Sequence, residues 1–399
     1  MSFNIALSGL QAINEQLETV SNNIANASTY GFKSSRANFS SMYAGEQPTG
    51  VQVGSLTQSI GVNGSVESTG RSLDAAIDGR GFFVARESTG TLSYSRVGIF
   101  AADKNGFLID AAGRKVQGYG PAANGNLGVM GDIEIPTGQI AASASTEVNY
   151  TGNLSADWEP KTAGAFDSTL PATYNMVKQS VLYDSLGTQH TVSQYFVKDG
   201  ATNQVNVYYG FDKAGANSSS PRTTLNFDVQ GQLTNTPPTS ANLTLNAGNG
   251  AANIVFNIDY SGTTRFAGDA TTTNNSTNGY ASGVYVGVEL SPDGSVVARY
   301  SNEQKQTVGT IAMATFGNEG ALTPTSETSW TANAASGLAL YGTPGTGLTG
   351  KLNTGALEGS NVDITSELVG LMTSQRNYQA NSKVITTQNQ MMQSLMQAL

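Results

Sequence analysis

The sequence predicts a mainly β protein that carries an α-helix at each end of the chain. Apolar residues recur with a helical period near both termini, whereas between them they alternate with polar residues, as in strands. Turn-forming sequences separate the alternating runs, and the 399 residues include 46 glycines. A chain of this length exceeds the size at which one hydrophobic core keeps growing, so we expect two or three domains.

The first helix is predicted by apolar residues spaced alternately three and four apart, which is a heptad pattern. These residues are Phe3, Ala6, Leu10, Ile13, Leu17, Val20 and Ile24. The segment NNIANASTYGFK, at positions 22–33, then ends the periodic run. Gly31 within this segment permits a sharp turn, so we expect the helix to lie within residues 1–30.

The last helix is predicted by an apolar column that recurs every seventh position up to Leu399. The column contains Ile364, Leu371, Tyr378, Ile385 and Met392. A second column, polar in its middle, contains Leu368, Gln375, Ser382, Asn389 and Met396. Asp363 or Asn361 can cap the start of this helix. A single amphipathic helix more often packs on its own domain, but heptad patterns at both termini favour a coiled coil and contacts with neighbouring molecules.

The middle of the chain predicts antiparallel strands joined by tight turns. Apolar residues occupy every second position in the runs 205–211, 225–229, 254–260 and 284–290. Turn sequences such as Ser291-Pro-Asp-Gly294 separate runs of this kind. Stretches rich in Thr, Asn, Ser and Gly near 143–172, 212–222, 234–253 and 268–279 are interpreted as loops or boundaries.

These patterns predict a division of the chain into nested parts. We expect terminal helices at 1–30 and 360–399, a connector at 31–70 and 345–359, an inner β domain at 71–145 and 281–344, and an outer β domain inserted at 146–280. The inner domain is thus built from both flanks of the chain.

The composition argues against several classes of function. The formal net charge is −9, whereas nucleic-acid binding requires clustered Lys and Arg. The absence of cysteine excludes disulfides, redox pairs and thiolate metal sites. The sequence contains no run of about eighteen apolar residues, which is the length needed to span a membrane. The N-terminal sequence MSFNIALSGL lacks the features of a cleavable signal peptide, so we expect a chain that is cytosolic or exported without one.

The residues offer little for catalysis or cofactor binding. The loop Gly345–Lys351 fits the first part of a phosphate-binding loop, but Leu352 stands where Ser or Thr should hold Mg²⁺. Two more glycines, Gly355 and Gly359, follow where a helix must begin, so a glycine-rich linker is the preferred interpretation. The single histidine, His190, is interpreted as a surface residue with no carboxylates grouped around it. We therefore expect no catalytic or metal site, no cofactor and no enzyme activity.

Four long motifs carry a resemblance to a known family. They are SGLQAINEQLETVSNNIANASTYGFKSSRANF (8–39), GRSLDAAIDGRGFF (70–83), SNEQKQTVGTIAMATF (301–316) and GALEGSNVDITSELVGLMTSQRNYQANSKVITTQNQMM (355–392). Through them the chain resembles the rod and hook axial proteins of the bacterial flagellum. The middle matches these proteins only in being β-rich and polar. Room for an insertion at 146–280 fits hook subunits better than rod subunits, which are shorter.

The resemblance implies a structural role. It implies a homopolymer of many copies, a curved tube that acts as a universal joint between rod and filament and as a channel for exported subunits. The implied partners are a rod protein, a hook-associated protein, a hook cap during assembly and the flagellar type III export apparatus. The implied location is extracellular, in the hook of the flagellum. The alternatives are a distal rod or hook-associated axial protein and, more distantly, a secreted β-rich adhesin.

We expect the assembly interface to comprise the two helical seams and the end of the first helix. Its predicted residues are Phe3, Leu10, Ile13, Leu17, Val20, Ile24, Asn22, Asn23, Asn26, Tyr30, Gly31, Phe32, Ile364, Leu371, Tyr378, Ile385 and Met392. The asparagines offer uncharged donors and acceptors, and the two aromatic residues can anchor in neighbouring molecules. The alternative explanation of the segment 22–33 is a plain helix cap and loop.

A channel lining is predicted on the last helix. Past Glu367 this helix contains only two charged residues, Arg376 and Lys383. An uncharged polar surface attracts neither the apolar nor the charged segments of an unfolded chain strongly. The residues predicted to line the channel are Gln388, Asn389 and Gln393.

Overall fold

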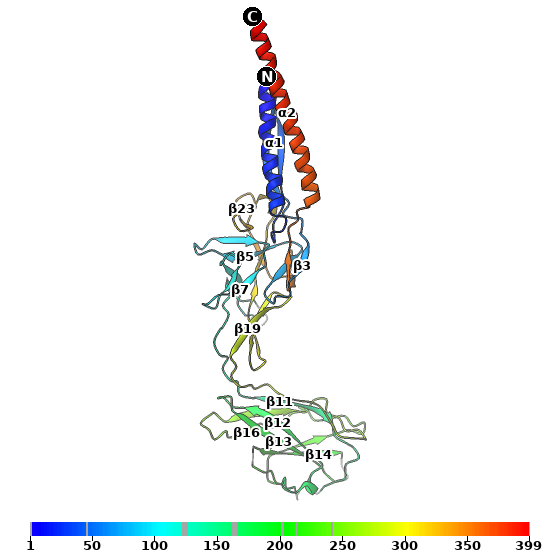
Figure 1. Cartoon of the computed structure of the whole chain (residues 1–399). Helices are drawn as coiled ribbons and strands as arrows, with labels where there is room; N and C mark the ends of the chain where they lie inside the picture. The colour runs from blue at the N-terminus through cyan, green and yellow to red at the C-terminus, as the bar shows by residue number, and fades with distance from the viewer. Residues whose placement is uncertain are drawn as a thin grey trace. The chain divides into compact units, whose positions relative to one another are not determined.

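The chain folds into two compact units. The computed structural model describes residues 2–44, 47–121, 127–161, 166–200, 203–212, 214–240 and 242–398. The first unit comprises Met1–Thr137, Val286–Arg299 and Lys305–Leu399, and the second comprises Gly138–Tyr285 and Tyr300–Gln304. Strands fill the middle of the chain, and a long helix stands at each end (Figure 1). The predicted class, mainly β with paired terminal helices, is confirmed.

The two helices belong to the first unit and pack along each other. They are α1 (Ser2–Ala25) and α2 (Ile364–Ala398). Asp363 caps α2, because its carboxylate accepts hydrogen bonds from the backbone N–H groups of Thr365 at 2.9 Å and Ser366 at 3.3 Å. These hydrogen bonds and one from the Ser366 hydroxyl lower the pKa of Asp363. Neither described helix combines the length and apolar character needed to cross a membrane.

A long two-stranded ribbon follows α1 and lies against it. Its strands are β1 (Ser35–Ala44) and β2 (Gln47–Gln58), which pair antiparallel. The register shifts between Asn38 and Phe39 and again between Met42 and Tyr43. The backbone N–H of Val51 donates to the Ser8 hydroxyl at 3.2 Å, which ties the ribbon to the helix.

The β part of the first unit is built from both flanks of the chain, as predicted. Its strands from the N-terminal flank are β3 (Val66–Ser68), β4 (Ala75–Asp78), β5 (Phe82–Arg86), β6 (Leu92–Ser95), β7 (Phe100–Ala102), β8 (Leu108–Asp110), β9 (Lys115–Tyr119) and β10 (Met130–Asp132). Those from the C-terminal flank are β19 (Tyr285–Leu290), β20 (Ser295–Tyr300), β21 (Lys305–Ile311), β22 (Met313–Thr315), β23 (Thr323–Thr325), β24 (Ser329–Thr331), β25 (Leu340–Gly342), β26 (Lys351–Thr354) and β27 (Ala356–Glu358). A short 3-10 helix spans Glu319–Ala321.

One sheet combines the two flanks around an aromatic core. Its main path runs β19-β20-β21-β9-β5-β6-β24-β23. Three strands of the N-terminal flank thus lie between strands of the C-terminal flank. Phe82 lies edge-on to Trp330, with ring centroids 5.6 Å apart, and Phe316 packs against both Phe82 and Tyr94. Smaller pairs join β26 to β4 and β27 to β3. The end of the chain before α2 is therefore fixed to the first strands after the ribbon.

The second unit is a β-sandwich. Its strands are β11 (Glu147–Asn153), β12 (Met176–Tyr183), β13 (Gln189–Lys198), β14 (Gln204–Phe211), β15 (Arg222–Asn226), β16 (Leu243–Leu245), β17 (Ile254–Asp259) and β18 (Thr271–Thr277), with a 3-10 helix at Pro171–Thr173. They form two sheets ordered β16-β17-β11-β18 and β12-β13-β14-β15. Both sheets contribute to one core that includes Tyr150, Phe196, Tyr209, Phe256 and Tyr260. The alternating residues of the runs 205–211 and 254–260 supply much of this core.

Several strand predictions were wrong in detail. The stretch 268–279, interpreted as a loop, contains β18, which pairs antiparallel with β11. Its side chains are Thr, Asn and Ser and are largely exposed, so backbone pairing forms this strand without any apolar alternation. Val229 is 85% exposed in the turn after β15. Val284, just before β19, and Val286 within this edge strand are also exposed.

Candidate assembly interface

The two helices run antiparallel, and specific contacts fix their register. The Asn23 side-chain amide donates to the Glu367 carboxylate at 2.8 Å. Further along, Gly370 faces Val20, and Gly9 faces Asn381 so closely that a Cβ on Gly9 would come 3.3 Å from the Asn381 amide nitrogen. On α1, Ile13 and Val20 are buried, while Leu10, Leu17 and Ile24 are half-buried. Of this seam, Val20 faces α2, and Ile13 lines a groove that α2 and the ribbon share. The side chain of Phe3 lies outside the described residues.

The seam of α2 differs from the predicted one in both columns. Leu371 and Ile385 are half-buried, but Ile364, Tyr378 and Met392 of the same predicted column are exposed. The partner column toward α1 consists of Glu367, Ser374, Asn381 and Gln388, not of Leu368 and its heptad equivalents. Ser374 is fully buried, and its small side chain, like that of Gly370, lets the helices approach closely. Of the second column predicted from the sequence, Ser382 alone is half-buried and the other four residues are exposed.

The segment 22–33 turns the chain out of α1 through contacts within the molecule. Asn23 is buried, and its side chain bonds both the backbone N–H and the backbone carbonyl of Ser35 besides Glu367. The Asn26 amide donates to the Asn22 carbonyl at 3.0 Å and accepts from the Thr29 hydroxyl at 3.1 Å. Asn23 thus braces the end of α1 against β1 and α2, whereas Asn22 and Asn26 bond within the segment itself.

Gly31 occupies a position that only glycine fits well. Its φ is +68°, and a Cβ would lie 2.9 Å from a methyl group of Val97. Its N–H donates to the Glu358 carbonyl at 2.8 Å. Tyr30 and Phe32 on either side are half-buried, and the Tyr30 hydroxyl lies 3.5 Å from the Glu67 carboxylate. The turn therefore docks directly on β27, the last strand before α2.

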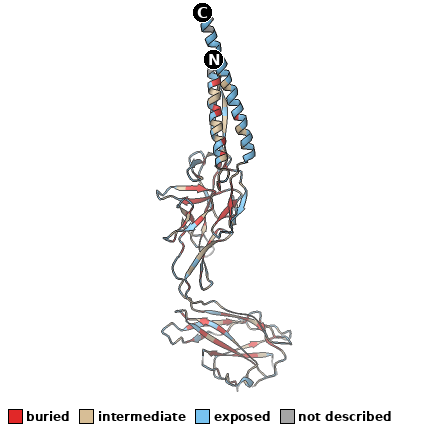
Figure 2. Ribbon diagram, in the orientation of Figure 1, coloured by how far each residue is buried: buried red, intermediate tan, exposed pale blue. Residues whose placement is uncertain are grey.

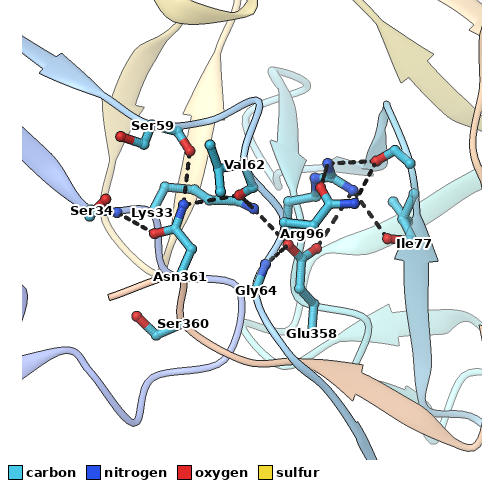
Figure 3. Close-up of polar contacts among 12 residues, drawn as sticks. Lys33, Ser34, Ser59, Val62, Gly64, Ile77, Arg96, Glu358, Ser360 and Asn361 are labelled. Carbon is cyan, nitrogen blue, oxygen red and sulfur yellow. Dashed lines mark hydrogen bonds and ion pairs between the residues drawn. The ribbon is translucent and has the colours of Figure 1, made fainter. Parts of the chain in front are cut away.

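A buried ion cluster lies beneath this turn (Figure 3). The Lys33 ammonium contacts one oxygen of the Glu358 carboxylate at 2.6 Å, and Arg96 lies 3.6 Å from the other oxygen. All three side chains are 0–1% exposed. Burial lowers the pKa values of Lys33 and Arg96, and Glu358 opposes both shifts. One carboxylate thus pairs with two buried cations from distant parts of the sequence, and one positive charge is left over.

Backbone carbonyls supply the remaining partners of the two cations. Lys33 donates to the Val62 carbonyl at 2.7 Å, and Arg96 donates to the Gly79 carbonyl at 2.8 Å and to the side chain of Asn63 at 3.0 Å. Carbonyl oxygens carry partial negative charge, so they compensate the second positive charge. The cluster joins the chain after α1, the β core and the strand before α2.

Asn361 completes the junction beside the ion cluster. Its side-chain oxygen accepts from the Ser34 N–H at 2.7 Å, and its nitrogen donates to the Ser59 and Val62 carbonyls, each at 2.9 Å. Asn361 therefore fixes both segments that flank the ribbon, and Asp363 is the residue that caps α2. The sequence interpretation missed Lys33, Arg96, Glu358 and Asn361 as a group. The only signal available was the scarcity of charge, since charged residues make up 12% of the chain.

Family models match this chain along most of its length. The match to the flagella basal body rod protein covers residues 3–33, and the flagellar hook protein FlgE/F/G D1 domain covers 76–156. The flagellar basal body protein FlaE D2 domain covers 153–280, and the flagellar basal body rod FlgEFG protein C-terminal model covers 353–398.

Curated relatives match the whole chain. The flagellar hook protein FlgE of Escherichia coli (strain K12) is 38% identical, with 99% of each chain covered. The chain belongs to the flagellar hook protein family. FlgE of Brucella suis is 34% identical over 98% of this chain and 96% of the relative, and FlgE of Borreliella burgdorferi is 29% identical over 98% and 97%. A crystal structure of Helicobacter pylori flagellar hook protein FlgE2 shares the fold, with a TM-score of 0.53 and 14% identity over 73% of this chain and all of the other.

Membership of the hook protein family gives the chain a structural function in the bacterial flagellum. Hook family proteins are structural subunits and are not known as enzymes. The helices, the turn at 22–33 and the junction with β27 lie within or beside the segments that match the rod and hook models. The end of α1 and the strand on which it docks thus fall in segments that match the family models.

The residues predicted to line a channel occupy different faces of α2. Asn389 and Gln393 are exposed. Gln388 is half-buried and continues the column that faces α1. Asn389 and Gln393 thus belong to the uncharged exposed surface of α2, whereas the Gln388 side chain is only partly exposed there.

The loop Gly345–Lys351 lacks the geometry of a phosphate-binding loop. In the loop Gly345–Lys351, Thr349 bonds the Thr343 carbonyl, the Gly345 N–H bonds Gly350, and β26 begins where a phosphate-binding loop needs a helix. Among the described residues, no group of three or more His, Asp or Glu side chains could hold a metal ion.

The interpretation of His190 as an unpaired surface residue was wrong. His190 is 7% exposed, and its ring nitrogens lie 2.9 Å from the Asp212 carboxylate and 3.4 Å from that of Asp184. Strand β13 pairs with β14, and this non-local pairing brings Asp212 beside His190. Asp184 also accepts from the Asn249 side chain at 2.6 Å. The hook family chain therefore holds its only histidine between two carboxylates in the second unit.

Proposed function

We propose that copies of this chain polymerise into a curved tube that serves as a flexible joint between flagellar rod and filament. The single observation that carries the proposal is the large apolar surface that α2 leaves exposed in one molecule. Large apolar residues at least 40% exposed occur on α2 over its whole length: Ile364, Leu368, Val369, Met372, Tyr378, Val384, Met391, Met392 and Met396.

Neighbouring copies would cover these side chains. Full burial of one large apolar side chain stabilises a contact by roughly 1.5–3 kcal/mol. Few charges oppose such packing, because α2 carries only Glu367, Arg376 and Lys383. The ribbon adds further exposed apolar residues, including Phe39, Tyr43 and Leu56. In this proposal the helices and ribbon form the inner wall of the tube, which is where the predicted interface residues of both seams belong.

The second unit would carry the sliding contacts of the joint. A tube bends when subunits approach on one side and separate on the other. Exposed Thr, Asn and Ser side chains, as on β18, offer many weak and interchangeable hydrogen bonds. Sliding then exchanges contacts without breaking a single strong one.

The tube would also conduct unfolded subunits. The exposed amides of Asn389 and Gln393 support a channel lining without charge, and Gln388 would contribute where it is not covered by α1. Export through the flagellar type III apparatus without a cleaved signal, a hook cap during growth, and junctions with rod and hook-associated proteins complete the proposal. The final location is the extracellular part of the flagellum.

Electron microscopy of the purified full-length protein tests the proposal. We expect curved tubes to grow with increasing protein concentration. Straight, rigid tubes would instead assign the chain to the distal rod or the hook-associated group. A protein that stays monomeric under all conditions that polymerise the relatives would contradict polymerisation as the basis of its function.

A further inference from the structure

The end of α2 extends past its partner helix. Asn23 lies opposite Glu367 and Gly9 opposite Asn381, so Ser2 falls opposite Gln388 at the same register. Residues 389–398 continue for about 15 Å beyond that point, and Figure 1 shows the C-terminus beyond the N-terminus. We call these residues the overhang.

The overhang carries an apolar surface that α1 cannot cover. Met391, Met392 and Met396 are 63%, 57% and 75% exposed. Figure 2 shows the exposed colour along this end of the helix. The overhang, NQMMQSLMQA, contains no charged residue. Methionine is unbranched and flexible, so its side chain fits irregular apolar grooves.

A groove of matching character runs between the two helices and the ribbon. Its apolar lining comes from Gly9, Ala12 and Ile13 of α1, Phe39 of the ribbon and Ala380 of α2, and the side-chain amides of Gln16, Asn377 and Asn381 also line it. Its volume is about 310 Å³, and none of its lining residues is charged.

The groove and the overhang of one molecule cannot meet. Ala380 of the groove and Met392 of the overhang lie on the same continuous helix, twelve residues or about 18 Å apart. The overhang of a second copy is free of this constraint. We propose that the groove binds the overhang of a neighbouring copy, with its methionines inserted between α1, α2 and the ribbon.

This contact is head-to-tail, because it joins two different surfaces of identical molecules. Contacts of this kind propagate into rings or helical assemblies and do not stop at a dimer. The inference rests on the proposed polymerisation and specifies which surfaces meet. An uncharged apolar end in an uncharged apolar groove also avoids burying an unpaired charge.

Disulfide cross-linking tests the contact in the full chain, which contains no cysteine. The test variant combines Ala380→Cys with Met392→Cys, and a second variant uses Met391→Cys in place of the latter. An internal disulfide is excluded, because bonded cysteines require Cα atoms roughly 4.4–6.8 Å apart. After polymerisation and oxidation we expect a ladder of linked oligomers. The matched control is Gln379→Cys with Met392→Cys, since Gln379 is exposed on the same helix but does not line the groove. This control should give no ladder.

A second measurement fills the groove. Ala380→Trp should raise the critical concentration for polymerisation at least about tenfold, whereas Gln379→Trp should leave it within about twofold of the parent. Tubes that form without any ladder would overturn the inference and leave the proposed function standing. A ladder from Ala380→Cys alone, or cross-links only to an added second protein, would also overturn it. A parent chain that forms no tube would contradict both proposals.

Discussion

At the residue scale, Glu358 holds together three segments that the sequence keeps far apart. It faces Lys33 and Arg96 at once, and both cations are fully buried. Removing a shared counter-ion therefore leaves two unpaired charges in the interior, whereas removing one cation leaves an intact pair. The three positions are thus unequal, although each contributes one charge to the cluster.

We expect Glu358→Gln to lower the free energy of unfolding of the first unit by about 3–5 kcal/mol, and Lys33→Met to lower it by less. Urea unfolding of the full chain measures both. In a Trp158→Phe background, buried Trp330 reports on the first unit alone, since the chain has two tryptophans. Lys351→Met is the matched control at an exposed lysine and should change little. A larger loss for Lys33→Met than for Glu358→Gln would contradict the shared counter-ion.

His190 allows a second test at the residue scale. Burial would lower the pKa of His190, but hydrogen bonds and charges from Asp212 and Asp184 outweigh it and raise the pKa above 6.5. A raised pKa gives stability that is fully present below the unfolded value and is lost as pH rises through the folded value. Burial alone would raise the pKa of Asp184, but hydrogen bonds from the Asn249 side chain and two backbone N–H groups outweigh burial and lower it. Asp184 therefore stays ionised while His190 titrates.

The imidazole signal of the only histidine can be followed by proton NMR. We expect a midpoint above 6.5, and Asp212→Asn should bring it down because the closer carboxylate is lost. The unfolding free energy of the second unit should fall as the pH rises above about 6.5 in the parent but not in His190→Gln. A midpoint at or below 6.5 in the parent would show that burial outweighs the two carboxylates.

At the scale of elements, the sequence predicted those parts whose pattern is local. The heptads of α1 and α2 and the alternating runs 205–211 and 254–260 correspond to real helices and strands. Period and burial agree on α1 and in the two runs, whereas on α2 the period predicted the helix but not its buried face. Strand β18 has no apolar period, so only its pairing with β11 defines it. The α2 partner column was missed because Glu367, Ser374 and Asn381 are polar, and only the position of α1 makes them a seam.

The same reasoning predicts which helix changes block assembly. Leu10→Asp or Ile385→Asp would place a carboxylate in a half-buried seam, where an unpaired charge costs several kcal/mol. We expect both variants to stay monomeric in sedimentation assays at concentrations where the parent forms tubes. Lys351→Ala, in the exposed glycine-rich loop, should polymerise like the parent. Normal tubes from Ile385→Asp would remove this seam from the assembly interface.

At the scale of the whole molecule, the two units have different roles in the proposed joint. The first unit contains the helices, the ribbon and the ion cluster, so it contains every residue of the predicted interface and channel lining. The second unit is a sandwich with its own core, built around residues such as Tyr150, Phe196 and Tyr260. A core of its own means that removing the second unit need not disturb the first.

Deleting residues 146–280 tests where bending resides. The chain segments that flank the deletion lie side by side, because Ile140 bridges Gly283 and Ser143 bridges Tyr280, so a short glycine-serine turn can rejoin them. If the second unit carries the sliding contacts, the shortened chain should still polymerise through its helices but give tubes of altered curvature. Image analysis of the tubes measures this, with the parent chain and Lys351→Ala as controls. Unchanged curvature after the deletion would place the flexible contacts in the helices, ribbon and inner sheet, where the groove and overhang also lie.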